Sequence, residues 1–146
     1  MKDGLVLNLL FDPEGGVMLR ATVQAGAFAG MSGAWFDLET LRRFSAALAA
    51  YPLGDEARAG IRGGYWKGNQ GSELAQLHVS LSAYATDSVG GLAMRVILAS
   101  PMPPAEELHR VEVALNITYN ALSLFVADLN QLLDGKIKEA MLDPSR

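Results

Sequence analysis

Apolar and polar residues alternate with a period of two along most of the chain. This alternation is typical of antiparallel strands that bury one face and leave the other face in water. Turn residues separate the alternating runs, most clearly Asp12 to Gly16 and Asp87 to Gly91. Strands are predicted at residues 5–11, 17–24, 27–36, 58–66, 75–84, 92–98 and 109–119.

One long run departs from this period and predicts a helix over residues 37–50. Asp37 is placed to accept the backbone N–H of Thr40 as an N-cap, and Phe36 is placed to pack on Leu41. Apolar residues then recur every three or four positions, which gives the helix one stripe that must be buried. Pro52 follows the run and ends it.

A second helix is predicted over residues 120–134, where the apolar stripe resumes. Asn120 is the expected N-cap, and Gly135 stands at the position of a C-terminal cap. The tail, residues 136–146, is expected to hold one or two helical turns around Ile137 and Met141.

Together these elements predict an α+β fold in a single domain of residues 1–135, followed by the tail. We expect about seven mostly antiparallel strands in a twisted sandwich or half-open barrel, with the two helices covering apolar edges or a face. The glycine-rich strand at 27–36 is expected to contain a bulge at Gly30 or Gly33.

Composition limits the compartment and the partners that the sequence predicts. The 146 residues include no cysteine, so no disulfide holds the fold, and the net charge of −4 argues weakly against nonspecific nucleic-acid binding. No apolar run approaches the roughly 18 residues of a membrane span. We therefore expect a cytoplasmic protein that binds neither nucleic acid nor membrane.

The pattern of reactive residues predicts no catalytic, cofactor-binding or metal-ligating site, so we expect no enzyme activity. His78 and His109 are the only histidines, and neither has a ligand partner at a metal-binding spacing. By strand parity His78 is expected to be exposed on a polar face. The run Gly63 to Gly68 differs from a phosphate-binding loop because Lys67 precedes the last glycine and a strand follows.

A group of basic and aromatic residues between 58 and 67 is the leading candidate for partner binding. Arginine, tyrosine and tryptophan are enriched in interface hot spots. Trp66 suits the core as well as the surface, and the sequence leaves the position of Trp35 open in the same way. Side chains predicted on the polar sheet face or at the start of the last strand extend the candidate surface. The candidate residues are Arg58, Arg62, Tyr65, Trp66, Lys67, His78, Arg110 and Glu112.

The order of motifs resembles the WapI-like bacterial immunity proteins and related small domains. The shared motifs are Trp35-Phe36 leading into Asp37-Leu38-x-x-Leu41-x-x-Phe44, the run Gly90-Gly91-Leu92-Ala93-Met94-Arg95-Val96, and Asn120-x-Leu122-x-x-Phe125-x-x-x-Leu129. The resemblance implies a non-enzymatic protein that neutralises the toxic domain of a bacterial toxin. An acidic protein would suit a basic nuclease toxin, but the acidic residues of this chain are scattered.

Three functions remain open from the sequence. The first is a protein-binding module, specifically an immunity-like protein. The second is a small-ligand-binding protein with an apolar pocket between sheet and helix. The third, an enzyme with a site around His78, Arg95 or Glu112, ranks last. A homodimer through a sheet edge, or through the tail near Ile137 and Met141, is compatible with each. The apolar pocket would be lined by Met18, Met31, Met94, Trp35 and Trp66.

Overall fold

Eight strands and two helices make up the fold in the computed structural model, which describes residues 2–53, 59–67, 73–100 and 109–146. The strands form two four-stranded antiparallel sheets that do not close into a barrel. The first sheet has the order β3-β2-β1-β8 and the second the order β4-β5-β6-β7. The elements are β1 (Gly4–Phe11), β2 (Gly16–Ala25), β3 (Phe28–Asp37), α1 (Leu38–Leu48), β4 (Gly60–Trp66), β5 (Leu74–Ala85), β6 (Leu92–Ala99), β7 (Arg110–Ile117), α2 (Tyr119–Leu133) and β8 (Glu139–Leu142).

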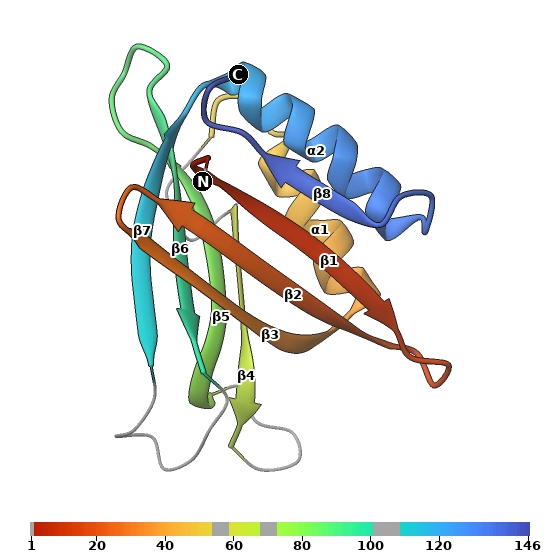
Figure 1. The fold of residues 1–146 in the computed structure, drawn as a ribbon. Coiled ribbons are helices and arrows are strands. Elements are labelled where there is room, and N and C mark those ends of the chain that lie inside the picture. The colour runs from red at the N-terminus through yellow and green to blue at the C-terminus, as the bar shows by residue number, and fades with distance from the viewer. Residues whose placement is uncertain (1, 54–58, 68–72, 101–108) are drawn as a thin grey trace.

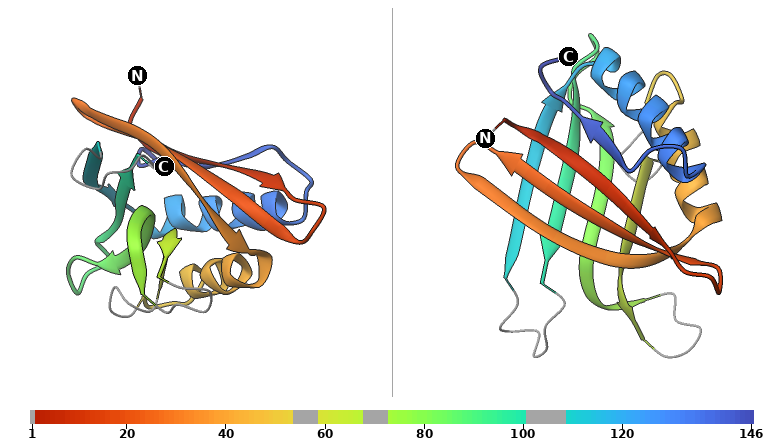
Figure 2. Two further views of the ribbon diagram at one scale, coloured as in Figure 1. Left: turned by 90° about the horizontal axis from the view of Figure 1, so that it is seen from below. Right: turned by 45° about the vertical axis from the view of Figure 1, so that its right-hand side comes forward.

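The two sheets lie face to face with their strands running in different directions (Figure 1). Strand β3 crosses the second sheet and contacts all four of its strands. The helices pack on each other beside the second sheet, where α1 contacts β3 and β4 while α2 contacts β1 and β8 (Figure 2). The predicted α+β sandwich is therefore confirmed, with one strand more than expected.

The core fills the space between the sheets and helices. Every inward residue of β2 from Val17 to Val23 is buried, and α2 buries Phe125 completely. The helix α1 begins as predicted, because Asp37 accepts a 2.7 Å hydrogen bond from the backbone N–H of Thr40. Within the described residues, neither helix is long and apolar enough to cross a membrane.

The predicted bulge in β3 is wrong. All ten residues of β3 pair with β2 without a register shift. Its glycines instead allow close approach, since a Cβ on Gly30 would lie 2.5 Å from Cγ1 of Val111. The register shifts lie between β4 and β5, at Gly63/Gly64 and Tyr65/Trp66.

The tail forms a strand rather than the predicted helical turns. The spacing of Ile137 and Met141 fits one helical face, but β8 pairs with the edge of β1 and buries Ala140 and Leu142. An open strand edge supplies backbone hydrogen-bond partners that a short isolated helix lacks.

Polar contacts hold the start of α2 and join the two ends of the chain. The N-cap of α2 is Thr118, two residues before the predicted Asn120, and its Oγ1 accepts the backbone N–H of Ala121 at 3.0 Å. The Lys2 ammonium lies 2.6 Å from the Asp143 carboxylate. This contact and hydrogen bonds from Ser145 hold the pKa of Asp143 well below its usual range. The chain's two ends are thereby joined beside β1 and β8.

The close contact of β4 with β3 gives a test of this packing. We expect Gly63→Ala to lower the free energy of unfolding by about 1 to 3 kcal/mol, because the added methyl overpacks the core. The new Cβ would lie 2.9 Å from the Cβ of Ala34 and 2.5 Å from Cζ of Phe36. Urea unfolding followed by circular dichroism measures the change.

Gly16→Ala is the matched control for this substitution. A Cβ at Gly16 meets nothing closer than 3.6 Å, so this change should leave stability nearly unchanged. Equal stability losses in the two variants would contradict the packing described at Gly63.

Candidate functional site

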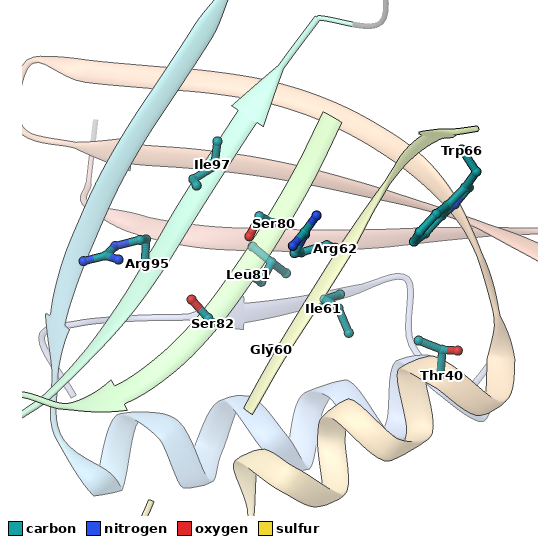
Figure 3. A pocket seen from close by; sticks show the side chains of 10 residues that line it. All are labelled: Thr40, Gly60, Ile61, Arg62, Trp66, Ser80, Leu81, Ser82, Arg95 and Ile97. Carbon is teal, nitrogen blue, oxygen red and sulfur yellow. The ribbon is translucent and has the colours of Figure 1, made fainter. Parts of the chain in front are cut away.

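A shallow depression of about 650 Å³ lies on the outer face of the second sheet, the face turned away from the first sheet (Figure 3). It extends across β4, β5 and β6 and reaches Thr40 in the first turn of α1. We call it the sheet groove. Its lining residues are Thr40, Gly60, Ile61, Arg62, Trp66, Ser80, Leu81, Ser82, Arg95 and Ile97.

Strand pairing brings the polar residues of the groove together. Arg62 on β4 lies opposite Ser80 on β5, and Ser82 lies opposite Arg95 on β6. Between these residues, Leu81 points inward and is fully buried. The period-two alternation therefore places two serines between two arginines, as Figure 3 shows.

The groove is rich in hydrogen-bond donors and carries positive charge. Within the described residues, Arg62 forms no ion pair, and neither Ser80 nor Ser82 makes a side-chain hydrogen bond. The Arg95 guanidinium lies 5.2 Å from the centre of the Tyr84 ring, and its Nη2 is 3.5 Å from the Tyr84 hydroxyl. This contact orients Arg95 and leaves it partly exposed.

The charge of the groove differs from that of the whole protein. The chain has sixteen acidic residues and a net charge of −4, but none of the described lining residues is acidic. Arginine guanidinium groups and serine hydroxyls donate hydrogen bonds to carboxylates and phosphates. The arrangement is therefore suited to an anionic group.

Two of the predicted binding residues, Arg62 and Trp66, line the groove. Trp66 lies at the end of β4 with 45% of its surface exposed, so it belongs to the surface rather than the core. Lys67 is exposed beside it and lies 3.4 Å from the Glu73 carboxylate. Arg58 lies outside the described residues.

Tyr65 and His78 form a separate contact near the same end of the sheet. Their rings meet edge to face with centroids 4.5 Å apart, and His78 Nε2 is 2.8 Å from Oε1 of Gln76. The predicted exposure of His78 is wrong, because only 2% of the residue is exposed. The register shift at Gly63/Gly64 interrupts the parity from which that exposure was inferred.

Arg110 and Glu112 lie on the edge strand β7 beside the groove. Glu112 is opposite Ile97, and its carboxylate is 3.4 Å from the Arg110 guanidinium. His78 and Glu112 thus have different partners, and the hydrogen bond between them that an enzyme site was expected to need is not formed.

The residues expected to line an apolar pocket do not converge. Met94 is fully buried in the core, whereas Met18 and Trp35 are cross-strand neighbours on the first sheet. Trp66 lies on the second sheet. In the described part of the chain, no group of three or more His, Cys, Asp or Glu residues is arranged to hold a metal ion.

Comparisons with known proteins found no matching family model, no matching curated protein and no matching solved structure.

The burial of His78 predicts a pH dependence of stability. Burial lowers the pKa of His78 below the usual 6.5, so the unfolded chain binds a proton more readily than the folded chain. We expect the free energy of unfolding to decrease as the pH falls from 6.5 towards the folded-state pKa. Thermal unfolding of the wild type and of His78→Gln across this range measures the effect.

His109→Gln, which changes an exposed histidine, is the control and should retain the pH dependence of the wild type. If His78→Gln also retains the full dependence, His78 is not its source.

Proposed function

We propose that the protein is a non-enzymatic binding module whose sheet groove docks an acidic segment of a protein partner. The observation that carries the proposal is the pairing of Arg62 and Arg95 with two serine hydroxyls in a groove whose described lining has no acidic residue. In this arrangement the arginines bind carboxylates of the partner, and the serines donate further hydrogen bonds.

The form of the groove favours a protein segment over a small molecule. A small-ligand site usually encloses its ligand, whereas this depression is shallow and extends across three strands. Exposed Trp66 at one end supplies apolar contact area of the kind found at interface hot spots. The alternative function is the binding of a small anion by the same arginines.

The resemblance to WapI-like immunity proteins suggests a class of partner. Under this proposal the partner is a toxin domain that presents an acidic segment to the sheet groove. The positive groove differs from the expectation based on net charge alone, which favoured a basic nuclease surface. Local charge at the interface governs steering and register more directly than net charge does.

Binding of a synthetic glutamate-rich peptide tests the proposal. We expect the wild type to bind this peptide more tightly than a glutamine-rich peptide of equal length, and less tightly at high salt. Arg62→Ala should weaken binding by about twofold to fivefold, because an exposed charge pair contributes up to about 1 kcal/mol. Isothermal titration calorimetry measures both effects.

Arg43→Ala is the matched control, because Arg43 is an exposed arginine on α1 and does not line the groove. It should leave peptide binding unchanged. Thermal stability should be unaffected by Arg62→Ala, since Arg62 is exposed and has no ion-pair partner within the described residues. Equal affinity for the two peptides, or equal losses in the two variants, would contradict the proposal.

A further inference from the structure

The outer face of the first sheet carries large apolar side chains in water, on the side of the sandwich opposite the sheet groove. Leu10 is 67% exposed and Trp35 is 52% exposed. The strand register places Met18 between them, so the three form a continuous row across β1, β2 and β3. This face is turned towards the viewer in Figure 1. Such a row is costly to leave in water and is typical of an interaction surface.

A second row, apolar apart from Thr22, lies nearer the other end of the same face. Met31 and Met141 are exposed at its two sides, with Thr22 and Val6 between them on β2 and β1. Both rows are on the outer side of the sheet, since Leu7, Leu19 and their inward neighbours are buried. The face therefore combines two apolar rows.

Between the apolar rows lies a row with one charge of each sign. Asn8 on β1 is the centre of this row, with Arg20 opposite it on β2 and Glu139 opposite it on β8. Both charged residues are exposed, and neither forms an ion pair with another residue in the described ranges. The two charges are thus two strands apart, with the central strand β1 between them.

We propose that this face binds a second copy of the chain, with the two-fold axis parallel to β1. Rotation about that axis exchanges the two sides of β1, so Arg20 of each copy meets Glu139 of the other. Leu10 then faces Leu10 of the second copy across the axis, and Val6 faces Val6 of the second copy. A two-fold axis perpendicular to the strands would instead bring Arg20 onto Arg20 and Glu139 onto Glu139, which like-charge repulsion disfavours.

The area of the face sets the expected strength of the dimer. With the axis along β1, β2 of each copy lies over β8 of the other, and β3 extends beyond the overlap. Three strands about 4.8 Å apart and about eight residues long give a flat footprint of roughly 400 Å² per copy. A standard stable interface buries about 800 Å² per partner. We therefore expect a dimer that forms at high protein concentration and dissociates on dilution.

Charge exchange at the two positions tests the proposed pairing. Sedimentation equilibrium of the full chain, from micromolar to submillimolar concentration, should show a monomer–dimer equilibrium for the wild type. Arg20→Glu and Glu139→Arg should each weaken the dimer at least tenfold, because each places like charges together across the axis. The double variant R20E/E139R should restore dimerisation to near the wild-type constant.

Arg43→Glu makes the same charge change on α1, outside this face, and is the control. It should leave the equilibrium unchanged. Circular dichroism of each variant checks that it folds. A wild type that stays monomeric throughout the range would overturn the proposal, and so would a dimer that the single variants do not weaken. A double variant that remains as weak as the single ones would overturn the proposed axis.

Discussion

Strand β3 can lie across the second sheet only because small residues stand where the two backbones approach. Gly63 faces Ala34 and Phe36, and Gly30 faces Val111, at distances that leave no room for a methyl group. This contact fixes the separation of the sheets and the position of Asp37, which ends β3 and caps α1. The helices then fill the remaining space. The buried core and both outer faces therefore depend on the crossing of β3.

The crossing also separates the two exposed surfaces. Each sheet has one buried face, so the sheet groove and the apolar face of the first sheet lie on opposite sides of the sandwich. The groove carries two arginines and two serines among apolar side chains, whereas the other face is apolar with one balanced pair of charges. In the proposed dimer, the two copies meet through the first sheet and both grooves stay open to partners.

Much of the fold follows from local patterns in the sequence. The alternation in residues 75–84 and the cap at Asp37 predict a strand and a helix because both depend on neighbouring residues alone. The turn centred on Ser88 and Val89 also places Ser82 opposite Arg95, because the two residues are equally far from it along the chain.

The partition of the strands into two sheets depends on distant contacts, and alternation alone does not encode it. For that reason the polar positions of both sheets look like one surface in the sequence, although Arg20 and Arg62 lie on different sheets. The burial of His78 depends on a register shift in the pairing with β4. The strand β8 depends on the open edge of β1, more than 130 residues away in the chain.

We propose that an acidic segment of a partner docks in the sheet groove. Mapping backbone amide shifts by NMR while the glutamate-rich peptide is added tests the location directly. We expect the shifts to concentrate on β4, β5 and β6, with Arg62, Ser80, Ser82 and Arg95 among the most affected. Shifts confined to the first sheet, or spread evenly over the surface, would contradict it.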